Sequence, residues 1–147
     1  MTAGYSGTPL WKKLALDDGQ RVLATGMPPS VKALLPPEIG VKTRGRGPWH
    51  AVLLFVTRRA DLAAALPERL PTLAPAEPKR GATPARRAGF IWVAWPKKTP
   101  AKGAATITTD LTEDVIREVA LPLGLVDVKV CAIDGAWSGL MLVVRKT

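Results

Sequence analysis

The segment HAVLLFVT at His50–Thr57 constrains the fold more than any other part of this sequence. Its centre, Ala51 to Val56, is an unbroken apolar run that is rich in Val, Leu and Phe. A strand without polar alternation needs helices over both faces of its sheet. A short buried helix is the alternative, but the run is only about six residues long and Pro48 and Arg58 lie close to its ends. We therefore predict a doubly buried strand in an α/β protein.

Three more strands are predicted before the carboxy-terminal region. GFIWVAW at Gly89–Trp95 has the same unbroken apolar character, and Pro96 stops it. RVLAT at Arg21–Thr25 follows the turn residues Asp17-Asp18-Gly19 and is predicted to be the first strand. Val41–Thr43 is predicted to be a weaker second strand. Helices are expected to connect these strands.

Capping signals and apolar spacing predict three of those helices. Thr8 is expected to cap a first short helix that has Pro9 at its first position. A second helix of barely two turns is expected over Val31–Leu35. Asp110-x-x-Glu113 has the form of a capping box for a helix over Leu111–Leu121.

The segment after the central strand divides into a helical part and a loop. Four leucines share one helical face, and Pro67 and Pro71 are expected to split that part into two short helices. These leucines are Leu62, Leu66, Leu70 and Leu73. The following Pro75–Arg87 segment is rich in Pro, Ala and basic residues and has almost no apolar bulk to bury. We predict that it is a mobile surface loop at about residues 75–88.

The carboxy-terminal region predicts an antiparallel hairpin. Val126–Ala132 alternates apolar residues with Asp127, Lys129 and Cys131, which is typical of an edge strand with one wetter face. A turn at Asp134–Ser138 joins this strand to Leu140–Val144 over a short distance, which requires antiparallel pairing. Cys131 is the single cysteine, and within this alternation a small buried side chain is a better interpretation than a nucleophile.

Composition limits the class of protein. A chain of 147 residues is expected to form one domain over 1–147. The formal net charge of +9 makes an anionic partner plausible, although a generally basic, solvated surface is the simpler alternative. The start, Met1–Thr8, is uncharged and lacks the pattern of a signal peptide, and no apolar run approaches membrane-spanning length. We therefore expect a cytoplasmic protein without a membrane partner.

Strands that alternate with helices and end in a hairpin predict a mostly parallel sheet with one reversed strand. This pattern resembles the Rossmann-like fold of AdoMet-dependent methyltransferases, whose last two strands form such a hairpin. LDDGQRVLATGMP at Leu16–Pro28 is similar to the first motif of that family. Leu73-Ala74-Pro75 with Gly89–Trp95 resembles its loop and strand after the central helix, with Ala76–Ala88 inserted.

A second resemblance covers nearly the whole chain. The segments YSGTPLWKKL, VLLFVT, WVAWPKK, GLVDVKVCAID and WSGL together resemble a family of small bacterial proteins known as a domain of unknown function. That resemblance implies no activity.

The departures from the methyltransferase pattern bear on function. The family motif presents an acid and several glycines to the cofactor, whereas here Ala24 replaces the acid, Gly26 is kept, and Pro28 and Ser30 replace other glycines. An intact AdoMet cradle is therefore not expected. Thr43 and Arg44 stand where an acid holds the ribose hydroxyls in related folds. Neither GxGxxG nor GxxxxGK[ST] is present in the sequence.

The candidate ligand site follows from the sheet alone, because ligands bind at the carboxyl ends of the strands of an open α/β sheet. This rule brings together four segments, and their candidate ligand-binding residues are Thr25, Gly26, Met27, Thr57, Arg58, Arg59, Trp95, Lys97, Lys98, Asp134, Trp137 and Ser138. The cations and indoles suit a phosphate or a stacked base. The alternative is that both indoles pack on the sheet while the cations point to water.

Other polar residues are not expected to supply catalysis or bind a metal. His50 is the only histidine, so a His-rich metal site is not possible. Asp134 and Ser138 are better explained as turn residues than as an acid and a nucleophile, because His50 is expected at the opposite end of the sheet.

Three hypotheses of function remain. The leading one is a non-enzymatic methyltransferase-like domain that binds an anionic ligand or partner at this edge. The second is an AdoMet-dependent methyltransferase that reaches the cofactor through the backbone of Gly26 and Met27. The third is a module that binds nucleic acid without sequence preference through the edge and the basic loop, which carries Lys79, Arg80, Arg86 and Arg87.

Overall fold

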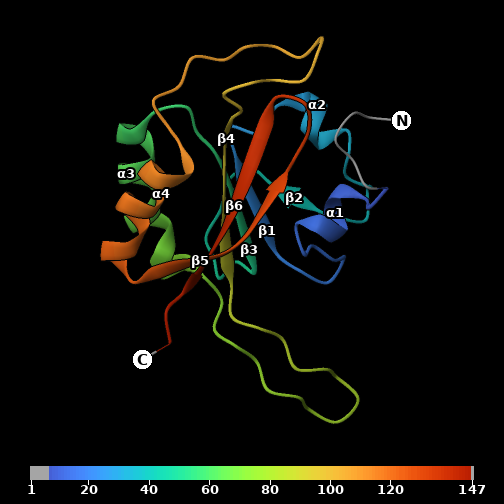
Figure 1. Ribbon diagram of the computed structural model, residues 1–147. Coiled ribbons are helices and arrows are strands. Elements are labelled where there is room, and N and C mark those ends of the chain that lie inside the picture. Colours follow the sequence, from blue (N-terminus) through green and yellow to red (C-terminus); the bar gives the residue numbers. More distant parts are fainter. Residues whose placement is uncertain (1–6, 147) are drawn as a thin grey trace.

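One sheet of six strands organises residues 7–146, which the computed structural model describes (Figure 1). The strand order is β2-β1-β3-β4-β6-β5. β6 runs antiparallel to both β4 and β5, and the other pairings are parallel. The prediction of a mostly parallel sheet with one reversed strand is confirmed. The strands are β1 (Val22–Thr25), β2 (Val41–Lys42), β3 (Ala51–Phe55), β4 (Phe90–Pro96), β5 (Leu125–Ala132) and β6 (Trp137–Val144).

Helices cover both faces of the sheet, as the apolar runs require. β3 and β4 are buried along their whole length. α1 and α2 pack on one face, and α3 and α4 pack on the other (Figure 1). Each fully buried Leu, Val or Phe of these strands contributes about 2 kcal/mol through removal of its surface from water. The helices are α1 (Leu10–Lys13), α2 (Pro29–Lys32), α3 (Arg59–Arg69) and α4 (Glu113–Ala120), with 3-10 turns η1 (Leu70–Thr72) and η2 (Leu121–Leu123).

The first two helices begin at other residues than predicted. Pro9, and not Thr8, occupies the N-cap position of α1, and no side chain caps that helix. α2 begins at Pro29 and contains four residues, so it is shorter than the predicted Val31–Leu35 helix and starts earlier. The part of the glycine-rich start before residue 7 lies outside the described residues.

Pro67 does not split the leucine helix, which is a further correction. α3 continues through Pro67 to Arg69. Pro67 and Ala63, whose carbonyl would accept the missing hydrogen bond, are both exposed, so water can satisfy that carbonyl. Leu62 and Leu66 are fully buried on the opposite side of the helix. Burial of the leucine face therefore outweighs one lost hydrogen bond.

The predicted capping box at Asp110 is wrong, and Asp110 serves another helix. The N-cap of α4 is Thr112, whose Oγ1 accepts a hydrogen bond from the Val115 amide at 3.2 Å. Asp110 Oδ1 instead accepts from the Arg59 amide in the first turn of α3 at 2.7 Å. A carboxylate at this position also interacts favourably with the positive end of the α3 dipole, which stabilises the helix. Asp110 thus ties the segment before α4 to α3.

The hairpin β5–β6 is confirmed, but the valine face of β5 is not buried. Val128 and Val130 are 53% and 47% exposed. A register irregularity between Asp127 and Lys129 is the reason, since one extra residue reverses the faces to which the following side chains point. Cys131 consequently packs, partly buried, against the core on the α1 side of the sheet.

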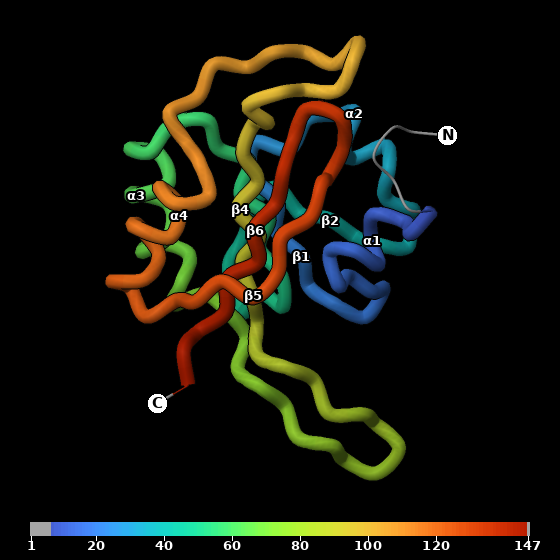
Figure 2. Tube along the Cα trace, viewed as in Figure 1, coloured from blue at the N-terminus to red at the C-terminus, as the bar shows by residue number. Residues whose placement is uncertain are grey.

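Residues 75–88 form a hairpin, which we call the basic arm. Every residue of this segment except Arg86 is exposed, and its mobility remains a prediction. Glu77 and Arg86 exchange two backbone hydrogen bonds of 2.8 Å, and Arg80 and Thr83 exchange two more. The basic arm projects from the amino ends of the parallel strands, away from the rest of the protein (Figure 2).

None of the described helices has the length and hydropathy needed to cross a bilayer.

Trypsin is expected to cut first at the tip of the basic arm. Lys79 and Arg80 are exposed, and the glycine that follows them has a φ of +57°. Arg86 is less accessible because it lies 3.5 Å from Asp17. Mass spectrometry of a brief digest should therefore find cleavage after Lys79 or Arg80 while the sheet stays folded. First cleavage elsewhere would contradict this expectation.

Candidate ligand site at the carboxyl edge of the sheet

The four segments predicted to form the site do lie along one edge of the sheet. β1, β3 and β4 end there, and β6 begins there with Trp137 opposite Pro96. Residues 97–112, which we call the strap, arch over this edge before α4 (Figure 1). Thr109 Oγ1 fastens the strap by donating a 2.6 Å hydrogen bond to the carbonyl oxygen of Thr57.

The two tryptophans of this edge are part of the core. Trp95 and Trp137 are each 8% exposed and belong to the cores on opposite faces of the sheet. The Trp137 ring meets Phe55 edge to face, with centroids 5.3 Å apart. Neither indole therefore offers an open face for stacking a base. Both indoles pack on the sheet, which is the alternative interpretation given in the sequence analysis.

The four cations of the edge have different surroundings. Arg59 pairs with Glu118 of α4 at 2.8 Å. Among the described residues, the charged groups of Arg58, Lys97 and Lys98 have no carboxylate within 4.0 Å. Arg58 is exposed at the start of α3, whereas Lys97 and Lys98 lie at the start of the strap. The two lysines are thus the unpaired cations nearest the end of β4.

A groove of about 720 Å³ separates the strap from the sheet edge. Its wall carries both lysines and many hydroxyl groups. The lining residues are Trp95, Lys97, Lys98, Thr99, Thr106, Ile107, Thr108, Thr109, Asp110, Leu111, Thr112, Glu113 and Ser138. Sequence reasoning missed the threonines of the strap. Their dense spacing in TITTDLT was the available signal, but it did not reveal that the strap folds back over Trp95.

The acids of the groove are already bonded to protein groups. Asp110 accepts from the Arg59 amide, as described above. Glu113 Oε2 lies 2.6 Å from Arg117 Nη2, and Arg117 also bonds Asp114 and Asp127. The hydrogen bonds that Arg117 donates, first to Asp127 and then to Glu113, raise the pKa of Arg117 above its ordinary value, so it stays charged. These partners reduce the negative field at the groove.

Several hydroxyl groups in the groove remain available. Within residues 7–146, the side chains of Thr99, Thr106, Thr108 and Ser138 make no hydrogen bond. The hydroxyls of Thr109 and Thr112, in contrast, hold the strap and cap α4. A hydroxyl group can donate to an anion, and an ammonium group adds charge to that contact.

A smaller cavity of about 270 Å³ lies at the ends of β1 and β2. It is lined by Ala24, Thr25, Gly26, Met27, Lys32, Val41 and Thr43. Gly26 has a φ of +69°, and a Cβ at this position would lie 2.7 Å from the Phe55 carbonyl oxygen. The glycine is therefore required by the close approach of β3, independently of any ligand.

The remaining candidates are structural or distant. Asp134 Oδ1 accepts 2.8 Å hydrogen bonds from the amides of Ala136 and Trp137, which is a turn role. His50 lies at the opposite end of the sheet, where its Nδ1 accepts from the Arg21 amide. Burial raises the pKa of the Cys131 thiol, which disfavours the nucleophilic thiolate. The described residues contain no cluster of three or more His, Cys, Asp or Glu that could hold a metal.

Comparisons with known proteins identify no family for this chain. No family model matches the chain, and no curated protein matches it. Among solved structures, "The structure of LepI complex with SAM" aligns with 92% of this chain at 14% sequence identity and a TM-score of 0.46. The alignment covers 39% of the LepI chain, so this protein spans about two fifths of that length.

Proposed function

We propose that the groove under the strap binds a small anionic ligand, most simply one with a phosphate group, and that the domain is a non-enzymatic relative of the methyltransferase fold. One observation supports this proposal above the others. Lys97 and Lys98 are unpaired beside free hydroxyl groups, while the groove's own acids already have partners. An anion would complete contacts that the protein leaves open.

Size and charge agree with such a ligand. The groove volume of about 720 Å³ falls inside the range of about 300–1,000 Å³ that is usual for small-molecule pockets. Hydrogen bonds to charged groups contribute about 1.5–3 kcal/mol each, about twice the value for neutral groups. Micromolar affinity corresponds to about 8 kcal/mol of net binding free energy, and these contacts must also offset the cost of association.

The residues around the smaller cavity suit AdoMet poorly. At about 270 Å³ the cavity is just below the usual range for small-molecule pockets. No acid lines it, although an acid at the end of the second strand normally holds ribose hydroxyls. It contains Lys32 instead, and a cation opposes a ligand whose sulfonium and ammonium groups outweigh its single carboxylate. We therefore derive no methyl transfer for this chain.

The double substitution Lys97→Ala/Lys98→Ala should weaken anion binding at least about tenfold, because it removes both unpaired cations of the groove. Calorimetric titration with pyrophosphate, AMP and AdoMet is the measurement. Lys12→Ala/Lys102→Ala is the matched control, since it removes the same charge from exposed residues that do not line the groove. The native protein should bind at least one phosphate compound, and the control variant should bind it equally well.

Three results would overturn the proposal. The first is phosphate binding that the double substitution leaves unchanged, and the second is no phosphate binding at all. The third is micromolar binding of AdoMet, which would favour the methyltransferase hypothesis.

A further inference from the structure

The basic arm is a projecting hairpin whose two halves are joined by backbone hydrogen bonds. Its two halves, residues 76–81 and 82–87, contain six residues each and are joined by the backbone pairs described above. At about 3.3 Å per residue, an extended strand of this length reaches about 20 Å. Every residue of the arm except Arg86 is exposed. A two-stranded ribbon of this kind fits the width of the DNA major groove, about 12 Å.

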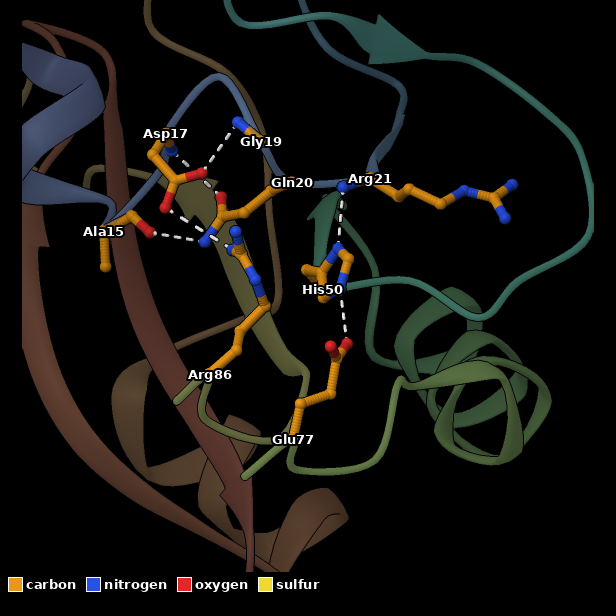
Figure 3. A network of polar contacts seen from close by, with 8 residues as sticks. All are labelled: Ala15, Asp17, Gly19, Gln20, Arg21, His50, Glu77 and Arg86. Carbon is orange, nitrogen blue, oxygen red and sulfur yellow. Dashed lines mark hydrogen bonds and ion pairs between the residues drawn. The ribbon is translucent and has the colours of Figure 1, made fainter. Parts of the chain in front are cut away.

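Each half of the basic arm is tied to the sheet by a side chain. Glu77 Oε1 lies 3.5 Å from His50 Nε2, and His50 Nδ1 accepts from the Arg21 amide at 2.8 Å (Figure 3). On the other half, Arg86 Nη1 lies 3.5 Å from Asp17 Oδ2 (Figure 3). Asp17 is held in turn by the Gly19 amide. These ties fix the direction in which the arm projects.

The charge around the basic arm is positive. Six cations lie there beside three acids, Asp17, Asp18 and Glu77, which leaves a formal charge of +3, and one ion pair joins Asp17 to Arg86. Arg21 extends the positive surface to the sheet edge, where it lies over the Trp49 ring at 5.0 Å and donates to the Arg46 carbonyl oxygen. The cations of this surface are Arg21, Arg46, Lys79, Arg80, Arg86 and Arg87.

The surface lacks what single-stranded nucleic acid requires. Proteins that hold single strands stack bases on exposed aromatic rings. Residues 75–88 contain no aromatic residue, and the neighbouring rings of Trp49 and Phe90 are each 1% exposed. Contacts to phosphates remain possible, and these need only positive charge at the spacing of a backbone.

We propose that the basic arm and the adjoining sheet edge bind the phosphate backbone of duplex DNA without sequence preference, with the arm lying in the major groove. The major groove of A-form RNA is too narrow for such a ribbon, which favours DNA over duplex RNA. This surface lies at the opposite end of the sheet from the strap, which lines the groove described above (Figure 2). The proposal therefore does not rest on the proposed function.

Fluorescence anisotropy with a labelled 20-base-pair duplex tests the proposal in the full chain. Lys79→Ala/Arg80→Ala should weaken binding roughly tenfold at 50 mM salt and lower the slope of log K against log salt by about 1.8, because each neutralised phosphate contributes about 0.9. Lys12→Ala/Lys102→Ala is the control, since it removes the same charge from exposed residues outside both surfaces. It should bind as the native protein does.

The nature of the ligand is tested with competitors. Unlabelled duplex DNA should compete at least about fivefold better than the single strand, the RNA duplex or poly-glutamate, because only B-form DNA presents the wide groove. Preference for the single strand or for poly-glutamate would overturn the proposal. So would equal binding by the Lys79→Ala/Arg80→Ala and control variants, or binding that ignores salt.

Discussion

Gly26→Ala is expected to lower the free energy of unfolding by about 2–5 kcal/mol without any ligand present. The φ of Gly26 is +69°, and a side chain in that region costs about 1–2 kcal/mol. The new Cβ would also lie 2.7 Å from the Phe55 carbonyl oxygen, a backbone atom of the central strand. Overpacking against an atom that cannot rotate away costs about a further 1–3 kcal/mol.

Urea unfolding followed by far-ultraviolet circular dichroism measures this loss. Gly40→Ala is the control, because a Cβ there meets nothing within 4 Å and the backbone has no positive φ. It should change the unfolding free energy by less than about 1 kcal/mol. Equal stability of the two variants would show that Gly26 is not required for packing, and a cofactor role for it would regain support.

Gly89→Ala is expected to have an effect of similar size, about 3 kcal/mol or more, at the base of the basic arm. Gly89 donates its amide to the Ala74 carbonyl oxygen where the arm returns to the sheet. A Cβ there would lie 2.4 Å from the Trp49 carbonyl oxygen and 2.9 Å from the Ala74 nitrogen. Both contacts are with backbone, so the strands themselves would have to separate.

The arm beyond this base should be dispensable for folding. Replacing residues 76–88 by a short glycine-containing turn removes mostly exposed residues. Each halving of the loop length changes the free energy of loop closure by only about 0.6 kcal/mol. Thermal melting of the shortened protein and of Gly89→Ala separates the two cases. We expect the shortened protein to melt cooperatively at a temperature near that of the native protein. Gly89→Ala should melt at a clearly lower temperature. Collapse of the shortened protein would mean that the ties to His50 and Asp17 are needed for stability.

The predictions that succeeded are those carried by burial over a whole segment. Ala51–Phe55 and Phe90–Pro96 form strands because every side chain of an unbroken apolar run is buried when helices cover both faces of the sheet. Their carboxyl ends then had to share one edge, since parallel strands connected by helices run in the same direction. The location of the candidate site followed from this order, and its binding role remains a prediction.

The predictions that failed depend on single atoms. Asp110 and Thr112 are both good caps, and only the packing of the strap against α3 decides that Asp110 bonds the Arg59 amide. Pro67 is tolerated in α3 because it faces water. The spacing of the leucines alone does not predict that the helix continues through this proline. Val128 and Val130 of β5 are exposed because one irregularity in register reverses the faces to which these side chains point.

The sequence by itself determined the class of sheet, its two fully buried strands, the closing hairpin and the excess of positive charge. Apolar pattern and charge are properties of residue types, and they act whatever the neighbours are. Tertiary structure decided which cations remain unpaired. Arg59 and Arg86 meet acids from distant segments, whereas Lys97, Lys98, Lys79 and Arg80 have no carboxylate partner within residues 7–146. Tertiary structure also placed Lys97 and Lys98 at the opposite end of the sheet from Lys79 and Arg80. Direction and partnership of a side chain depend on contacts between segments far apart in sequence, so the folded chain alone fixes them.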